Sequence, residues 1–151
     1  VGPDGKSSWD LLPQQATYRS HLSDQLTATS NAGATIHAFG VKAEAEAFGQ
    51  NPGQKLTSAS GFPGSIAAEA LKNGKSVALV QTGHIAEPGT AAFIAQVPAR
   101  KDYEDIAKQV VQSGVQVILT GGEKYLLPKS VQGQFGVGER EDDLNLIQWA
   151  K

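Results

Sequence analysis

The chain has 151 residues and a mass of 15.8 kDa, enough for one ordinary domain or a section of a larger one, since domains hold roughly 100 to 200 residues. Hydrophobic residues make up 40% of the chain and charged residues 19%, which excludes a disordered chain and a coiled coil. The net charge is -2 and the basic residues form no stripe, so nucleic acid is not expected as a partner.

Signals for a membrane segment and for a complete metal site are also missing from the sequence. No apolar run reaches the roughly 18 residues that would span a bilayer, and the first residues do not resemble a signal segment. The chain has no cysteine, which excludes disulfides and thiolate metal sites. Three histidines remain as imidazole ligands (His21, His37 and His84), fewer than a complete zinc enzyme usually needs.

One helix is predicted in the first third of the chain. Residues 1–26 show no helix or strand period, so we expect an irregular lead-in. Residues 30–39 (SNAGATIHAF) are small and compatible with a helix, and Gly40 provides a stop. Residues 48–61 are rich in glycine, proline and serine, which indicates an exposed connection.

A helix and a strand are predicted next. Residues 65–74 have the pattern of a helix that ends at Gly74, with Ile66, Ala70 and Leu71 on one face. Residues 76–81 (SVALVQ) form a short apolar run that contains β-branched side chains, which is typical of a buried strand.

The same alternation then repeats. Residues 90–97 and 101–114 predict a helix divided at Pro98, with three side chains facing inward (Ile106, Val110 and Val111), and residues 115–122 predict a second strand that ends in glycines. Helices and strands that alternate with such short connections predict an α/β fold with a mostly parallel sheet sandwiched by helices.

The last residues predict a short helix. Residues 139–143 (EREDD) suggest its solvated start, because acidic side chains are favoured at a helix N-terminus. Leu144, Ile147 and Trp149 would lie near one side of it. The chain stops within this pattern and begins in a loop, so we expect a fold that is incomplete at both ends.

Candidate functional residues follow the first strand, because ligands in parallel sheets bind beyond the carboxyl ends of the strands. Thr82, His84, Glu87 and Thr90 lie within nine residues and offer oxygen and imidazole donors suited to a hard cation such as magnesium. The alternative is a polar loop in which Thr90 caps the next helix.

Two further candidates have structural alternatives of their own. Ser30, or Thr29, opens a helix of small residues and would serve either as a nucleophile beside a bound phosphate or as a helix cap. Arg100 follows Pro98 and would either clamp two phosphate oxygens or lie solvated at a helix start. The glycines of ILTGGEKY match no phosphate-loop spacing and are expected only to turn the chain.

Taken in order, these segments resemble the metal-dependent alkaline phosphatases. The resemblance is carried by four blocks, TSNAGATIHAFGVK, GKSVALVQTGHIAEPGTAAFIAQVPARKDY, VQVILTGGEKYLLP and GEREDDLNLIQWAK, and covers about residues 27–151. The family's D-S-A-x-x-A-T-A segment, which runs into G-V-K, carries its nucleophilic serine. Ser30 falls on that serine, while Thr29 stands in place of the aspartate and Asn31 in place of the alanine.

The resemblance assigns roles to further residues. Arg100 in PARKDY matches the phosphate-clamping arginine, and Glu87 matches the Asp or His near the magnesium site. Gly89 occupies the family's ligand-threonine position, so Thr90 is displaced by one residue as a metal ligand. The resemblance thus implies Ser30 and Arg100 as catalytic residues, Thr29 as the fallback nucleophile, and Glu87 and Thr90 as metal ligands.

The implied activity is hydrolysis of small phosphate monoesters through a phosphoserine, with zinc and magnesium as cofactors. We expect residues 1–151 to be the central part of one catalytic domain, inactive when isolated because metal ligands are missing. A periplasmic or extracellular location and a possible homodimer are further implications. Two alternatives stay open: a phosphodiesterase or sulfatase of the same superfamily, and a noncatalytic α/β segment.

Overall fold

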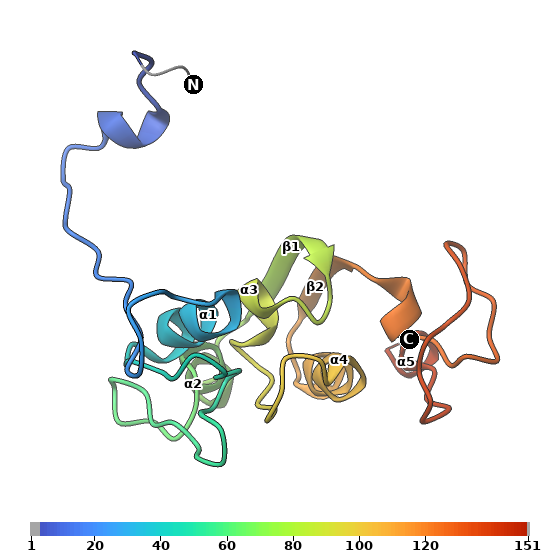
Figure 1. Cartoon of the computed structure of the whole chain (residues 1–151). Coiled ribbons are helices and arrows are strands. Elements are labelled where there is room, and N and C mark those ends of the chain that lie inside the picture. Colours follow the sequence, from blue (N-terminus) through green and yellow to red (C-terminus); the bar gives the residue numbers. More distant parts are fainter. Residues whose placement is uncertain (1–3, 151) are drawn as a thin grey trace.

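The computed structural model describes residues 4–150 and contains a pair of parallel strands with helices packed against it (Figure 1). The main elements in chain order are α1 (Ser30–Phe39), α2 (Ile66–Lys72), β1 (Ala78–His84), α3 (Pro88–Ala91), α4 (Tyr103–Gln112), β2 (Val117–Gly121) and α5 (Leu146–Trp149). Two short 3-10 helices, η1 (Ser8–Leu11) and η2 (Glu123–Tyr125), complete the regular structure of the described part. The predicted α/β fold with a parallel sheet is confirmed.

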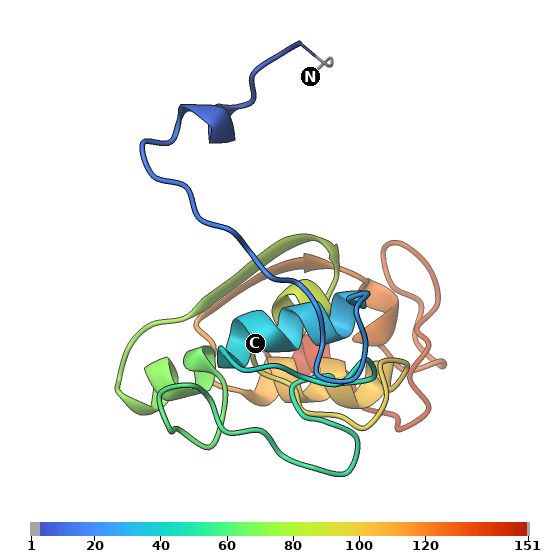
Figure 2. The same cartoon turned by 60° about the vertical axis from the view of Figure 1, so that its left-hand side comes forward.

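The strands pair in parallel with a defined register. Leu79 lies opposite Ile118, and after an irregular stretch His84 lies opposite Gly121. The helices lie on one side of this strand pair (Figures 1 and 2). On the other side, Val80 is 62% and Leu119 59% exposed, so helices cover one face of the strands in residues 4–150 rather than both. The main core lies between the helices and the covered face and is built around Phe48, Ile85, Ile106, Val110 and Leu146.

The described chain begins with a largely irregular segment, and residues 1–3 of the expected lead-in lie outside the described residues. Residues 4–21 are almost entirely exposed, and their first part, which contains η1, extends away from the rest of the molecule (Figure 2). Near the end of this segment, Tyr18 contacts His37 of α1. The chain joins the body at Leu22, which is buried beside Ala32 and Ala43 in a second small core. Lys42 holds this junction by donating to the carbonyl oxygens of Arg19 and His21. In residues 4–150 no helix is both long and apolar enough to cross a membrane.

The boundaries of α1 agree with the sequence, whereas those of α3 do not. α1 spans the predicted residues and ends at Gly40, whose φ of 70° is the left-handed conformation that glycine adopts at little cost. The helix predicted over residues 90–97 is wrong beyond Ala91, because α3 is a single turn and the chain continues irregularly to α4. The first strand is also longer than predicted, since β1 extends through Thr82 and Gly83 to His84.

The predicted exposure of residues 48–61 is wrong at its beginning. Phe48 is fully covered, and Gly49 and Asn51 are also buried. Phe48 belongs to the main core, where it packs with residues of α1, α3 and α4. The rest of the segment is mostly exposed, as the glycine, proline and serine content indicated.

The predicted solvated helix start at residues 139–143 is wrong at Arg140. This side chain is only 1% exposed and donates to Tyr125 O (2.9 Å), Glu104 O (3.0 Å) and both carboxylate oxygens of Asp142 (2.9 and 2.5 Å). Those hydrogen bonds from Arg140 hold the pKa of the Asp142 carboxyl below its usual value. The Arg140–Asp142 pair therefore contributes fully to the free energy of unfolding at any pH above the ordinary pKa of an aspartate. This contribution is lost as the pH falls through the lowered pKa of Asp142.

The final helix is shorter than predicted and buries a different side chain. α5 begins after Asn145, whose side chain accepts a hydrogen bond from the N-H of Gln148. Leu146 is the residue that enters the core, whereas Trp149 and Leu144 are exposed. The expected grouping of Leu144 with Ile147 and Trp149 on one side of the helix is wrong at Leu144, because this residue precedes the single turn of α5.

Removing the buried guanidinium should destabilise the fold. We expect Arg140→Met to lower the free energy of unfolding by on the order of 3 kcal/mol, because it leaves two carbonyl groups and Asp142 without their donor. Lys129→Met, which breaks the exposed pair with Glu141, is the control and should leave the urea midpoint unchanged. Equal midpoints for the two variants would contradict a structural role for Arg140.

Candidate active site

The N-terminus of α1 presents Ser30 to solvent. Thr29 is the N-cap: its hydroxyl accepts a hydrogen bond from the N-H of Ala32 (3.3 Å) and donates to Ala45 O (2.6 Å). The capping role that was open to Ser30 or Thr29 is therefore filled by Thr29. Ser30 is exposed at the first helical position, and its N-H and that of Asn31 have no acceptor within residues 4–150. Such free N-H groups at a helix N-terminus favour an anion.

Residues 45–49, which we name the strap, fasten α1 to the next part of the site. Asn31 donates from its side chain to Ala45 O (3.2 Å) and Ala47 O (2.9 Å), and the Thr35 hydroxyl accepts from Gly49 N (2.9 Å). On its other side the strap accepts a hydrogen bond at Phe48 O from Val97 N (3.1 Å). The strap thus fixes the distance between α1 and the segment that leads to Arg100.

Gly49 allows this close packing. Its φ is 67°, and a Cβ atom at this position would lie 2.0 Å from the carbonyl oxygen of Ala95. An L side chain would therefore meet both an unfavourable backbone conformation and a direct clash.

The end of β1 supplies His84, and the start of α3 supplies Glu87. The turn between them is closed by a hydrogen bond from Glu87 N to His84 O (2.9 Å), and Gln81 donates to the same oxygen (2.9 Å). Glu87 is the N-cap of α3 but its side chain makes no cap hydrogen bond, so the carboxylate is free to turn toward Arg100. Thr90, which was the alternative cap, lies inside α3.

Arg100 brings the candidates together. One terminal nitrogen of its guanidinium donates to the Ser30 hydroxyl and the other to Glu87 Oε2 (3.3 Å). The other oxygen, Glu87 Oε1, lies 3.1 Å from His84 Nε2. Arg100 is 41% exposed and therefore accessible to a ligand. Ser30, Glu87 and Arg100, which were proposed from separate segments, thus meet at one place. A solvated arginine at a helix start would not need these contacts, so they favour the functional interpretation of Arg100.

These residues fit a metal site only in part. Glu87 and His84 offer one carboxylate and one imidazole, and within residues 4–150 no group of three or more His, Asp or Glu side chains could hold a metal ion. Thr90 makes no side-chain hydrogen bond with the described residues, so its role as a ligand stays a prediction. A complete zinc site does not fit the described residues, whereas a share in a magnesium site fits the oxygen of Glu87.

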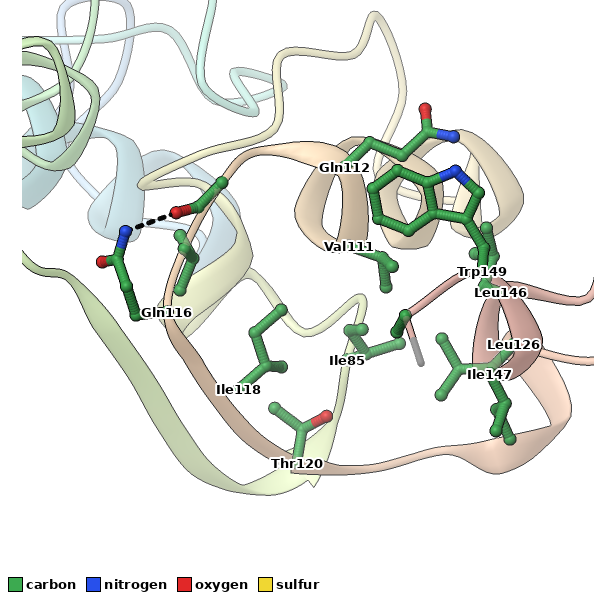
Figure 3. A pocket seen from close by; sticks show the side chains of 13 residues that line it. Ile85, Val111, Gln112, Gln116, Ile118, Thr120, Leu126, Leu146, Ile147 and Trp149 are labelled. Atoms are coloured by element: carbon green, nitrogen blue, oxygen red, sulfur yellow. Dashed lines mark hydrogen bonds between the residues drawn. The ribbon is translucent and has the colours of Figure 1, made fainter.

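A cavity of about 620 Å³ lies elsewhere, between the end of α4, β2 and α5 (Figure 3). Ile118, Leu126 and Trp149 are among the side chains that line it, and no ionisable side chain is among the described residues of its wall. It lacks the convergent polar groups that usually mark a catalytic pocket. The chemistry of this chain is therefore to be sought at Ser30 and not in this cavity.

The arrangement has counterparts among solved structures. The alkaline phosphatase of the Antarctic bacterium TAB5 superposes with a TM-score of 0.75 over 99% of this chain at 21% identity, and a mutant of that enzyme with magnesium bound in its M3 site superposes equally. The alkaline phosphatase of Thermus thermophilus matches 87% of this chain with a TM-score of 0.72 at 23% identity. The fold is therefore that of the alkaline phosphatases.

The sequence gives the family. The family model for alkaline phosphatase matches residues 1–151, so the chain belongs to the alkaline phosphatase family. An alkaline phosphatase of Gadus morhua is 27% identical over 173 aligned positions that cover 97% of this chain. The chain spans 36% of that relative and 39% of the TAB5 enzyme, well under half of either.

The tight contact between Gly49 and Ala95 should make Gly49 necessary for the stability of the fold. We expect Gly49→Ala to lower the free energy of unfolding by on the order of 3 kcal/mol, from backbone strain together with the clash against Ala95 O. Gly53→Ala is a matched control, since Gly53 has a similar φ of 71° but nothing within 4 Å, and should cost only about 1 kcal/mol. Urea unfolding measures the loss of stability in both variants. Equal losses would show that the close contact between Gly49 and Ala95 O does not restrict the side chain at position 49.

Proposed function

We propose that the protein containing this chain hydrolyses phosphate monoesters and that Ser30 is its nucleophile. The observation that carries the proposal is the contact of Arg100 with both Ser30 and Glu87 at the N-terminus of a helix. A planar guanidinium next to a hydroxyl suits a phosphoryl group, because it can bind two oxygens while the hydroxyl faces phosphorus. Membership of the alkaline phosphatase family supports the same activity.

The proposed reaction has two displacements. The Ser30 oxygen attacks phosphorus as the ester P-O bond breaks, the hydroxyl proton is lost, and the alcohol leaves with a proton. Water then attacks the phosphoserine, which releases inorganic phosphate and restores the serine. Arg100 would hold two nonbridging oxygens in both steps, where positioning and charge neutralisation provide most of the rate enhancement.

Zinc and magnesium are part of this proposal. Glu87 is the residue of this chain that would help to hold magnesium, with Thr90 as a further candidate. When bound, such metals supply Lewis-acid activation of a hydroxyl and stabilise a leaving oxygen. The magnesium in the M3 site of the TAB5 mutant supports metal use in the family. Because the described residues do not complete a zinc site, we assign no step of the reaction to zinc.

Other properties of the whole protein stay proposals that family membership supports. They are a periplasmic or extracellular location, a small-molecule phosphoester as substrate and possible homodimerisation. Two features favour a sister activity on diesters or sulfates as the second candidate: Thr29 stands at the position where the family has an aspartate, and Thr90 is displaced as a ligand.

Ser30 should carry the covalent intermediate. In the whole gene product, acid quenching during turnover of a phosphomonoester should leave phosphate on Ser30, and Ser30→Ala should lower kcat/KM by at least about 1000-fold because no nucleophile remains. Peptide mapping distinguishes Ser30 from Thr29, whose hydroxyl is already engaged by Ala45 O. Ser60→Ala, at an exposed position outside the site, is the control. Label on Thr29, or full activity of Ser30→Ala, would remove Ser30 from the mechanism.

Arg100 should bind phosphate as a fork. Arg100→Ala should weaken inhibition by inorganic phosphate by about 100-fold, and Arg100→Lys should restore only part of the loss, because an ammonium cannot hold two oxygens in one plane. The control is Lys101→Ala, which removes the neighbouring exposed cation. Inhibition constants measured by steady-state kinetics decide the matter, and an unchanged constant in Arg100→Ala would count against the clamp.

A further inference from the structure

We propose that His84 is a positioning residue that keeps Arg100 available for phosphate by occupying one oxygen of Glu87. This inference rests on the proposed function, in which Arg100 binds the phosphoryl group. It concerns a histidine whose ring lies behind the carboxylate and makes no contact with Ser30 among the interactions of the described residues.

The contacts of Glu87 carry the argument. Its Oε1 lies 3.1 Å from His84 Nε2 and its Oε2 accepts from Arg100 at 3.3 Å, so the carboxylate is shared between two partners. A carboxylate oxygen has only lone pairs, so the contact with Nε2 is favourable when that nitrogen carries a hydrogen. An arginine and a carboxylate otherwise tend to pair through two parallel hydrogen bonds. His84 at Oε1 opposes this two-oxygen pairing and leaves the second guanidinium nitrogen directed to Ser30.

The ring of His84 is held in place by its surroundings. It packs against Tyr125 (centroids 4.8 Å apart) and edge-on against Tyr103 (5.5 Å). Gly122 makes room for it, since a Cβ atom there would lie 2.5 Å from the Cβ atom of His84. With 26% of its side chain exposed, His84 has little freedom to leave Glu87.

The environment of His84 Nδ1 indicates which ring nitrogen carries the hydrogen. This nitrogen is buried without a hydrogen-bond partner among the described residues. A buried Nδ1-H without an acceptor would cost more than a buried lone pair, which favours the tautomer with the hydrogen on Nε2, the nitrogen that faces Glu87. The burial of Nδ1 and the contact at Nε2 therefore favour the same tautomer.

Two substitutions separate the Nε2-H group from the aromatic ring. In the whole gene product, His84→Phe keeps the packing against Tyr103 and Tyr125 but lacks the Nε2-H group. We expect it to raise both the dissociation constant for inorganic phosphate and KM by about 10-fold, with kcat within about threefold of the original, because the loss acts on phosphate binding. His84→Gln retains an N-H group at similar reach and should recover most of the loss.

A double substitution tests whether His84 acts through Glu87. In a Glu87→Ala background, His84→Phe should cause no further loss of phosphate affinity, whereas additive losses would overturn the proposal. His37→Phe, at an exposed histidine that contacts Tyr18, is the control and should leave phosphate binding unchanged. Should His84→Phe fail to fold, His84→Leu replaces it.

Measurements of phosphate binding also distinguish failure of this inference from failure of the proposed function. Arg100→Ala is measured beside the His84 variants by calorimetry with inorganic phosphate. Weaker binding in Arg100→Ala together with unchanged binding in His84→Phe would overturn the role of His84 alone. Unchanged binding in Arg100→Ala would overturn both. A loss in His84→Gln with none in His84→Phe would show that the histidine serves only packing.

Discussion

The strap of residues 45–49 is the constraint on which the candidate site depends. It is fastened to α1 through Asn31 and Thr35, and to the segment before Arg100 through the hydrogen bond from Val97 N to Phe48 O. Ser30 and Arg100 lie 70 positions apart in sequence, so their meeting requires a rigid connection between the two segments. The backbone groups and the buried Phe48 of the strap provide that connection without a regular helix or strand.

Small residues bring the elements of the site close together. Ala34 of α1 packs in one core with Ala91 and Ala92, which lie at the end of α3. Because alanine side chains are short, α1 and α3 can approach closely, and α3 in turn lies against β1. The site is thus positioned by the packed face of the strand pair. The other face of the strand pair carries the exposed side chains of Val80 and Leu119.

Sequence patterns predicted the features that depend on local interactions. α1 could be predicted because small residues, a capping Thr29 and a terminal Gly40 all act within a few positions. The burial of Phe48 and Arg140 could not, because it depends on distant partners: Val97 N for the strap, and the carbonyl groups of Glu104 and Tyr125 for the arginine. Charged runs are usually solvated, so EREDD gave no signal that one of its members is buried.

The sequence indicated which residues belong to the candidate site but not how they contact one another. Ser30, Glu87 and Arg100 were assigned through the resemblance to a family, and each has a structural alternative when considered alone. The contact of His84 with Glu87 was not predicted, although their spacing of three residues was visible in the sequence. That contact depends on the extension of β1 to His84 and on the space left by Gly122.

A crystal structure of the whole gene product with bound vanadate would test most directly whether these residues form one phosphoryl-transfer site. Our account predicts vanadium bonded to Ser30 Oγ, two vanadate oxygens on the guanidinium of Arg100, and Glu87 still next to His84. Vanadate bound elsewhere, or at Ser30 with Arg100 turned away from it, would contradict the account.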